Sequence, residues 1–249
     1  MSPRTHVIAG GTKGIGWETA VAVAQRGDTV VLGYHADAAA AEAAVGRAEE
    51  CGLRAVPVRV DMGDPAGPGR LVGAALAEGL PLGHLVHSVG EVHGGPLLEI
   101  PQADFSHALN ANAVSLLDLV RAAHPHLEAG CTVLYVTSRG GRAVYPGYGS
   151  LGPAKALAEA LVRYLAVELA PDGIRVNAFA PGAQDTGALR AVFGDATDSV
   201  LESARAKNPM GRLVQPEDYR PLVTFVCSPQ AAMITGQVFY VHGGADLLS

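Results

Sequence analysis

Short apolar runs alternate with helical patterns along almost the whole chain. The apolar runs, which read as strands, cover residues 5–10, 29–34, 54–60, 84–89, 131–137, 174–179 and 237–242. Segments with helical periodicity lie between them, at residues 14–25, 38–51, 65–78, 104–128, 154–170 and 216–227. This alternation is typical of a parallel sheet with crossover helices, so we expect an α/β fold with seven strands.

The stretch after the sixth strand breaks the alternation. Ala180-Pro181-Gly182 turns the chain into a mixed segment of about 30 residues, which is too long for an ordinary connection. We expect a substrate lid over residues 183–211, with an irregular helix at 187–207. Its apolar residues favour an apolar substrate, although such residues also pack on a sheet; they are Leu189, Val192, Phe193 and Met210.

Length and charge narrow the possible partners. The absence of a linker in 249 residues favours one domain, spanning residues 1–249. The net charge of −6 is spread thinly and includes no basic run, so nucleic acid is not an expected partner. No run approaches the roughly 18 apolar residues of a membrane span, and residues 1–6 lead into the first strand without a signal peptide. We expect a soluble cytoplasmic protein without a membrane partner.

Cysteine and histidine spacings predict no metal site. Cys51, Cys131 and Cys227 lie far apart without CxxC spacing, and we interpret them as small buried hydrophobic residues in a reducing compartment. None of the nine histidines belongs to an HExxH or comparable ligand pattern. We therefore expect no metal.

A glycine-rich loop joins the first strand to the first helix. Its glycines supply backbone without Cβ atoms where the N–H groups of a helix N-terminus point outward, so it suits a pyrophosphate. Glycines also form ordinary tight turns, but the position between strand and helix favours phosphate binding. The residues expected at the cofactor are Gly10, Thr12, Lys13, Gly14, Ile15 and Gly16.

The end of the second strand bears on the choice of cofactor. NAD-binding folds often place an acid there to hold the ribose 2′-hydroxyl, but this chain has Gly33-Tyr34-His35, and Asp37 comes later. Near Lys13 and His35, a 2′-phosphate would meet less repulsion and some positive charge. The pattern favours NADP(H), while a solvated Lys13 is an equally good interpretation of that residue.

Polar residues follow several predicted strands at their carboxyl ends, where parallel sheets bind ligands. They are Asp61 and Met62 after the third strand, His87, Ser88, Gly90 and His93 at the fourth, and Ser138 after the fifth. We expect them to face a cofactor crevice, except that a histidine within a strand, such as His87, is more often a hydrogen-bonded core residue.

Tyr148 and Lys155 are the candidates for acid chemistry. Seven residues on a helix are about 20° short of two full turns, so the two side chains would share one face. A nearby lysine and the positive end of a helix both lower the pKa of a phenol, so Tyr148 would exchange a proton near neutral pH. A buried tyrosine and a solvated lysine are the competing interpretation. Pro153 disfavours helix before it, so the helix would begin near Ser150 with Tyr148 in the preceding turn.

Over essentially its whole length the chain resembles a short-chain dehydrogenase/reductase. Gly10, Gly14 and Gly16 match the TGxxxGxG loop of that family, with Ala9 in place of its threonine. Asp61 matches the acid near the adenine, and Asn112 matches the asparagine of the proton relay. The active site is matched by Ser138, Tyr148 and Lys155, and the segment beside the nicotinamide is matched by Pro181, Gly182 and Thr186. The resemblance implies a single-domain Rossmann fold, doubly wound, with a parallel seven-stranded sheet and helices on both faces. It also implies an oxidoreductase that uses a nicotinamide cofactor.

Two departures resemble one branch of the family. Most members have the tyrosine four residues before the lysine, where this chain has Leu151, whereas its Tyr-x6-Lys spacing is similar to that of enoyl-thioester reductases. The run His87-Ser88-Val89-Gly90 replaces the usual Asn-Asn-Ala-Gly and resembles the His-Ser pair of some enoyl reductases. Residues 164–189 and 208–213 resemble the NADPH-dependent enoyl-acyl carrier protein reductase III branch.

Three functions are compatible with these residues. The first is reduction of an α,β-unsaturated acyl thioester by NADPH, with Tyr148 at the enolate oxygen, Lys155 on the nicotinamide ribose and Ser138 as a second donor. The second is reduction of a ketone, such as a polyketide-like intermediate, with Tyr148 as the proton donor. The third is a cofactor-binding protein without turnover. The substrate would be a small molecule or a carrier-bound acyl group.

The helix at residues 157–169 bears on assembly. It is apolar or small on nearly every side, which is more than one face of a sheet covers. We expect a second copy of the chain to cover the remainder, in a homodimer or homotetramer, unless the lid does so.

Overall fold

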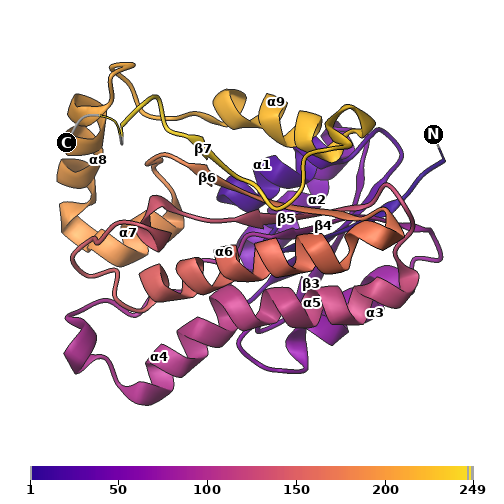
Figure 1. Cartoon of the computed structure of the whole chain (residues 1–249), viewed down its shortest axis with the longest axis horizontal. Helices are drawn as coiled ribbons and strands as arrows, with labels where there is room; N and C mark the ends of the chain where they lie inside the picture. Colours follow the sequence, from indigo (N-terminus) through magenta and orange to yellow (C-terminus); the bar gives the residue numbers. More distant parts are fainter. Residues whose placement is uncertain (1, 246, 248–249) are drawn as a thin grey trace.

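Seven parallel strands form one sheet in the order β3-β2-β1-β4-β5-β6-β7. The computed structural model describes residues 2–245 and 247, and Figure 1 shows the arrangement of its elements. The strands are β1 (Thr5–Ala9), β2 (Thr29–Tyr34), β3 (Arg54–Arg59), β4 (Leu82–His87), β5 (Thr132–Val136), β6 (Arg175–Pro181) and β7 (Val238–Val241). The sheet confirms the predicted fold class, and each predicted strand is present with ends that differ by a few residues.

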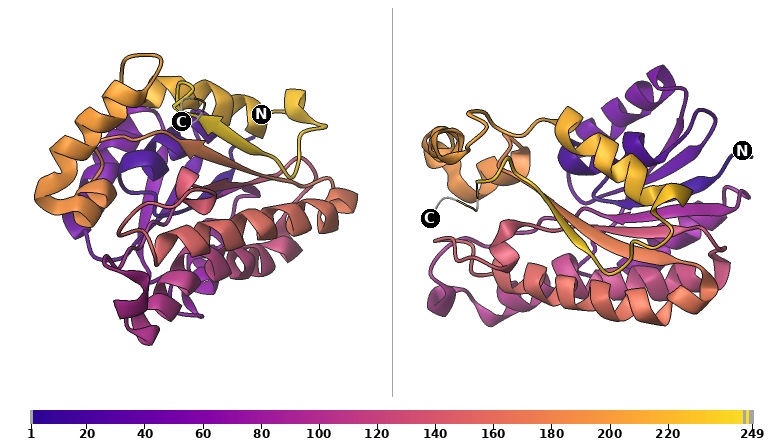
Figure 2. Two further views of the ribbon diagram at one scale, coloured as in Figure 1. Left: turned by 60° about the vertical axis from the view of Figure 1, so that its left-hand side comes forward. Right: turned by 45° about the horizontal axis from the view of Figure 1, so that its top comes forward.

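Helices cover both faces of this sheet, as Figure 1 and Figure 2 show. One face packs against α1 (Gly14–Val23), α2 (Ala38–Glu50) and α9 (Pro216–Cys227), and the other against α3 (Gly67–Leu76), α5 (Ser115–Ala123) and α6 (Leu151–Glu168). The central strands β1 and β5 are buried at every residue, which explains why they read as continuous apolar runs. Strand order reverses between β1 and β4, and ligands of such sheets bind at that switch point.

The helix predicted at residues 104–128 is divided in the structure. It consists of α4 (Gln102–Leu109), a π-helical turn at Asn110–Val114, and α5, followed by a 3₁₀ turn at His124–His126. Asn112 lies in the π-helical turn, where its amide donates to the carbonyl of Ala108 at 2.8 Å. The prediction of one continuous helix is wrong because this buried side chain competes with the regular backbone pattern.

The predicted lid contains two helices in place of one irregular helix. They are α7 (Gly187–Phe193) and α8 (Thr197–Lys207), joined by a 3₁₀ turn at Gly194–Ala196. Gly194 has φ +49°, a positive value that glycine adopts readily, and α7 ends immediately before this residue. Figure 2 shows the two helices together at one end of the molecule, beyond the sheet.

Helix α6 begins at Leu151, three residues earlier than the apolar pattern predicts, and Tyr148 lies in the turn before it. Pro153 is tolerated because the first turn of a helix needs no intrahelical N–H donor. Farther along α6, Tyr164 and Val167 are 71% and 75% exposed, so the lid does not cover this face.

Two further sequence expectations have different outcomes. Cys131 and Cys227 are buried as expected, but Cys51 is exposed at the end of α2. Within residues 2–245 and 247, none of the helices combines the length and apolar character that a membrane crossing requires.

Candidate active site

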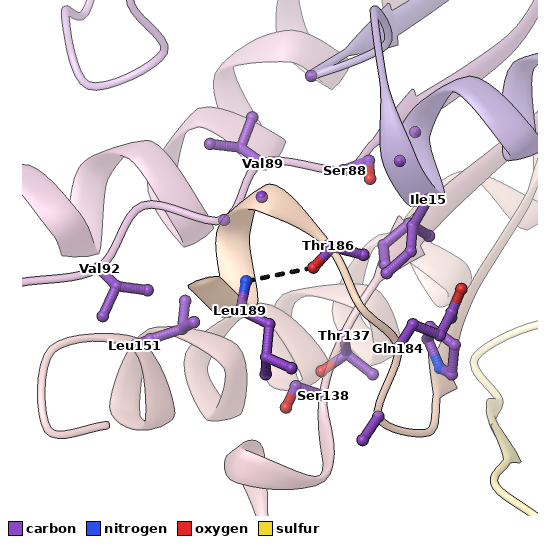
Figure 3. A pocket seen from close by; sticks show the side chains of 18 of the residues that line it. Ile15, Ser88, Val89, Val92, Thr137, Ser138, Leu151, Gln184, Thr186 and Leu189 are labelled. Atoms are coloured by element: carbon purple, nitrogen blue, oxygen red, sulfur yellow. Dashed lines mark hydrogen bonds between the residues drawn. The ribbon is translucent and has the colours of Figure 1, made fainter. Parts of the chain in front are cut away.

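A cavity of about 1280 Å³ lies at the carboxyl ends of the strands. Its walls come from the loops after β1, β4 and β5, the first turns of α6, and the segment between β6 and α8, and Figure 3 shows part of them. Most of the predicted site residues line it: Gly10, Thr12, Lys13, Gly14, Ile15, Gly16, His35, Asp61, Met62, Ser88, Gly90, Ser138, Tyr148, Lys155, Pro181, Gly182 and Thr186. Two do not line it: Asn112, which is fully buried, and His93.

The loop between β1 and α1 approaches β4 closely. Gly10 has φ +74°, and a Cβ atom there would lie 2.7 Å from the carbonyl oxygen of Ser88. A Cβ atom at Gly16 would in turn collide with the carbonyl oxygen of Gly10. Only glycine fits at these two positions, and the α1 N-terminus is left open for an anionic group. The loop therefore fits the pyrophosphate of a dinucleotide.

Lys13 does not present a free positive charge to this part of the cavity. Its Nζ donates to Oδ2 of Asp37 at 2.5 Å, and this hydrogen bond lowers the pKa of Asp37 below its usual value. The same carboxylate caps α2 by accepting from the N–H of Ala40. The positive charge that we predicted beside His35 is thus offset by Asp37, which comes after the end of β2 in the sequence but lies next to Lys13 in the structure.

Asp61 is fixed at the end of β3 by two partners. Its carboxylate accepts the N–H of Gly63 at 2.8 Å and lies 3.2 Å from Nε2 of His107. Burial raises the pKa of Asp61, but these hydrogen bonds outweigh burial and leave the pKa below its usual value. Asp61 is therefore an ionised acceptor in the wall of the cavity.

Tyr148 and Ser138 bring two hydroxyl groups together in the cavity. The hydroxyl of Tyr148 lies 3.5 Å from Oγ of Ser138, which also accepts the N–H of Gly140 at 3.0 Å. The Tyr148 ring lies against Gly140, where a Cβ atom would come within 2.5 Å of it. Burial raises the pKa of Tyr148, so the prediction of a lowered phenol pKa is wrong. The helix begins only after Tyr148, and the two-turn geometry with Lys155 does not apply.

Lys155 is buried, at 4% exposure, and its ammonium group is held by backbone. Nζ donates to the carbonyl of Val89 at 3.0 Å and to that of Val136 at 2.9 Å. It also lies 4.7 Å from the centre of the Tyr135 ring. Burial lowers the pKa of Lys155 to about 7, although the carboxylate of Glu159 acts in the opposite direction. Lys155 therefore lies in the cavity wall with its ammonium group held between two backbone carbonyls.

Asn112 and Ser150 fix the loop that follows β4. Asn112 accepts the N–H of Glu91 at 3.0 Å and donates to its carbonyl at 2.8 Å. Ser150 accepts the N–H of His93 at 2.9 Å and donates to its carbonyl at 3.0 Å. Asn112 is thus a positioning residue in this structure.

His93, which we expected in the crevice, does not line the cavity, whereas Glu91 does.

His87 confirms the core interpretation. It is fully buried, its Nε2 lies 2.7 Å from Oγ of Ser115, and it does not line the cavity. Burial lowers the pKa of His87 to about 3, and the charge of Lys155 acts in the same direction, so the ring is neutral.

One wall of the cavity, formed by residues outside the glycine-rich loop, is apolar. Leu151, Val92 and Leu189 line it, and Figure 3 shows the Leu151 side chain beside Val92 and that of Leu189 next to Ser138. Phe193 also contributes, whereas Met210 is 67% exposed and does not. The side chain of Val192 lies outside the part of the chain that the structure describes. Leu189 is oriented by Thr186, which caps α7 by accepting the Leu189 N–H at 3.2 Å.

Sequence patterns missed two residues of this site. Tyr135 is fully buried within β5; its hydroxyl donates to the carbonyl of Asn112 at 2.6 Å while its ring lies under Lys155. Glu91 follows Gly90, and its position after a strand was the signal that could have identified it. Tyr135 had no such signal, because a tyrosine inside an apolar strand reads as core.

Known proteins resemble this chain over nearly its full length. A family model described as enoyl-(acyl carrier protein) reductase matches residues 9–246. The 7α-hydroxysteroid dehydrogenase of Escherichia coli K12 is 33% identical, with 98% of this chain and 94% of that protein covered. A solved 7α-hydroxysteroid dehydrogenase in complex with NADH and 7-oxo glycochenodeoxycholic acid has a TM-score of 0.87 at 31% identity, with 97% and 93% covered.

Two further relatives differ in the reaction that their names describe. The 1-cyclohexenylcarbonyl-CoA reductase of Streptomyces collinus is 29% identical, with 99% of this chain and 88% of that protein covered. The angucycline C-6 ketoreductase LanV, solved with bound NADP, has a TM-score of 0.86 at 26% identity, with 98% and 96% covered. The fold, the nucleotide loop and the family match agree. The chain therefore belongs to the short-chain dehydrogenase/reductase family and is a nicotinamide-dependent oxidoreductase.

Proposed function

We propose that this protein uses NADPH to reduce the C=C bond of an α,β-unsaturated acyl thioester. One observation carries the proposal: the phenol that reaches Ser138 belongs to Tyr148, while the position one turn before Lys155 is the apolar Leu151. Most of the family has its tyrosine at that position. The match to the enoyl-(acyl carrier protein) reductase model and the similarity to a CoA-ester reductase support the same reaction class.

The displaced phenol suits the geometry of an enoyl thioester. The reaction adds hydride to the β-carbon, and the oxygen that gains negative charge is three bonds from that carbon. A carbonyl reductase, in contrast, needs its acid on the oxygen of the very carbon that accepts hydride. Moving the phenol from four to seven residues before the lysine shifts it about 4.5 Å along a helix axis, and the turn before α6 makes that figure approximate.

The chain's own groups have distinct roles in this proposal. The nicotinamide cofactor supplies the hydride when bound. Tyr148 and Ser138 donate hydrogen bonds to the enolate oxygen, and their partial burial strengthens these bonds. A proton from water then adds to the α-carbon and completes the reduction. Lys155, whose Nζ donates to two backbone carbonyls at the cavity wall, holds the nicotinamide ribose. Leu151, Val92 and Leu189 accommodate the acyl chain and exclude water.

Reduction of a ketone is the second candidate. The relatives named hydroxysteroid dehydrogenase and ketoreductase support it, as does the serine beside the phenol. In that reaction Tyr148 would protonate the carbonyl oxygen and Ser138 would orient it. A cofactor-binding protein without turnover is disfavoured, because the chain belongs to a family of oxidoreductases.

NADPH is the proposed cofactor in both reactions. A neighbouring structure holds NADP and another holds NADH, so the preference rests on this chain's own residues. Lys13 and His35 line the cavity where a 2′-phosphate would lie, and Asp37 offsets the positive charge of Lys13.

A direct assay separates the two reactions. The purified protein is incubated with NADPH and either crotonyl-CoA or acetoacetyl-CoA, and loss of NADPH absorbance is followed. We expect turnover with the crotonyl thioester and at least about tenfold lower kcat/KM with the keto thioester. Oxidation of NADPH by the keto substrate alone would favour the second candidate.

A further inference from the structure

We propose that Glu91, His93 and His107 form a binding site for one divalent transition-metal ion at the rim of the cavity. One ligand atom from each residue lies within 4.8 Å of the other two. Two of these residues come from the loop after β4 and the third from α4. The site does not depend on which substrate the enzyme reduces.

The distances between the ligand atoms suit a first-row metal. Nε2 of His93 lies 3.1 Å from Oε1 of Glu91, and Nδ1 of His107 lies 2.5 Å from the same oxygen. Bonds of about 2.0–2.2 Å to zinc at tetrahedral angles separate neighbouring ligand atoms by roughly 3.3 Å. The His93 pair already has this spacing, the His107 ring needs to move outward by less than about 1 Å, and the ligand nitrogens of the two histidines lie within 4.8 Å of each other.

Each imidazole has a second carboxylate on its far side, at hydrogen-bond distance for His107 and farther away for His93. The remaining nitrogen of His107, Nε2, lies 3.2 Å from Oδ2 of Asp61. The remaining nitrogen of His93, Nδ1, lies 3.9 Å from Oδ2 of Asp104. Metal-bound histidines almost always direct their other nitrogen toward a carboxylate or carbonyl, which fixes the tautomer and strengthens the ligand. The contact with Asp61 gives His107 the outer partner that is typical of a metal-bound histidine.

The backbone of the ligand loop is held in place before any ion binds. Asn112 binds both the N–H and the carbonyl of Glu91, and Ser150 does the same for His93. His107 stands on α4 directly over Gly63, where a Cβ atom would collide with its ring. Each ligand therefore needs only small side-chain adjustments, which reduces the entropy lost on binding.

The donor set selects the class of ion. Two imidazoles and one carboxylate suit Zn²⁺, Co²⁺ or Ni²⁺, whereas Mg²⁺ and Ca²⁺ prefer oxygen ligands throughout. The side chains of Glu91, His93 and His107 are 23%, 32% and 36% exposed, so a fourth position is open to water. A divalent ion would also offset the three nearby carboxylates of Glu91, Asp61 and Asp104.

Metal titration of the full-length protein tests the site. Zn²⁺ binding is measured by calorimetry, and Co²⁺ is added to a second sample to record the visible absorption typical of a low-coordinate nitrogen and oxygen site. We expect one ion per chain. His93→Ala and His107→Ala should each weaken binding at least about tenfold. Glu91→Gln keeps the side-chain volume and should have the same effect, and His126→Ala, an exposed histidine outside the cluster, should bind like the parent protein.

The comparison among variants decides the outcome. Equal affinity of the parent protein, His93→Ala and His107→Ala would overturn the proposal, because any bound ion would then lie elsewhere. Absence of saturable Zn²⁺ binding by the parent protein would also overturn it and leave a hydrogen-bonded network. Circular dichroism checks that each variant is folded. If a histidine variant is not folded, the Zn²⁺ affinity of Glu91→Gln decides whether the cluster binds the ion.

Discussion

Nζ of Lys155 lies 4.7 Å from the centre of the Tyr135 ring, inside a site where its other partners are two backbone carbonyls. The ring and the carbonyls replace only part of the water that a lysine has in the unfolded chain. Burial therefore lowers the pKa of Lys155 to about 7 from an ordinary value of 10.5.

The first prediction follows from this difference in pKa. Between about pH 7 and pH 10.5 the unfolded chain binds more protons at Lys155 than the folded chain, so the contribution of this residue to stability rises with pH across that window. The free energy of unfolding in urea is measured for the parent protein and for Lys155→Met. As the pH rises, the value for the parent minus that for the variant should increase by at most about 1.4 kcal/mol per pH unit. Lys207→Met, at an exposed lysine, should show no such trend. A difference that is constant from pH 7 to pH 9.5 would contradict the lowered pKa.

Tyr148→Phe should reduce turnover at least about a hundredfold, because the variant removes the hydroxyl that lies beside Ser138. The affinity for NADPH, measured by fluorescence titration, should change little. Tyr145→Phe is the matched control, since Tyr145 packs edge-on against Tyr148 and also lines the cavity. Unchanged turnover in Tyr148→Phe would remove this phenol from the mechanism.

Leu151→Tyr should shift the enzyme toward ketone reduction. The substitution places a phenol one helical turn before Lys155, where it would reach the oxygen of the carbon that accepts hydride. We expect the ratio of kcat/KM for acetoacetyl-CoA over crotonyl-CoA to rise at least about tenfold relative to Leu151→Phe. The phenylalanine variant adds similar bulk to this buried position without a hydroxyl. Equal ratios in the two variants would show that the hydroxyl at this position has no influence on the choice of reaction.

Asp37→Asn should strengthen the preference for NADPH. The carboxylate of Asp37 neutralises Lys13 at the place proposed for the 2′-phosphate, and the amide keeps the cap on α2. We expect the ratio of NADPH to NADH affinity to rise by up to roughly fivefold, the scale of an exposed charge interaction. Lys13→Met should lower the ratio, and Asp64→Asn, at an acid paired with Arg70 outside the cavity, should leave it unchanged. A fall in the ratio for Asp37→Asn would place the 2′-phosphate elsewhere.

The exposed face of α6 leads to the last prediction. Tyr164 and Val167 leave a largely apolar helix face without a cover from the same chain. We expect light scattering at micromolar concentration to give the mass of a homodimer or homotetramer. The double variant Tyr164→Glu, Val167→Glu should have a lower mass in solution. Met233→Glu, at a methionine that is 96% exposed, should keep the mass of the parent protein. A monomer in the parent protein would contradict the prediction.

The sheet was predictable from sequence because burial on both faces makes its central strands, such as β1 and β5, continuous apolar runs. The nucleotide loop was predictable for a related reason, since a close approach between Gly10 and the carbonyl of Ser88 admits no side chain. Interruptions within helices were not predictable. The π-helical turn depends on Asn112 meeting Glu91, which lies 21 residues earlier in the chain.

The amino-acid sequence by itself determined the fold, the nucleotide loop and the candidate hydroxyl groups. These features depend on local periodicity and on residues next to strand ends. Tertiary structure decided what those groups face. It placed Lys155 over Tyr135 and away from a direct role in lowering the pKa of Tyr148, and it paired Lys13 with Asp37. It also brought His93 and His107 to one carboxylate of Glu91. Partners such as Lys13 and Asp37, which are 24 residues apart, are brought together by packing of the whole domain, which no local pattern records.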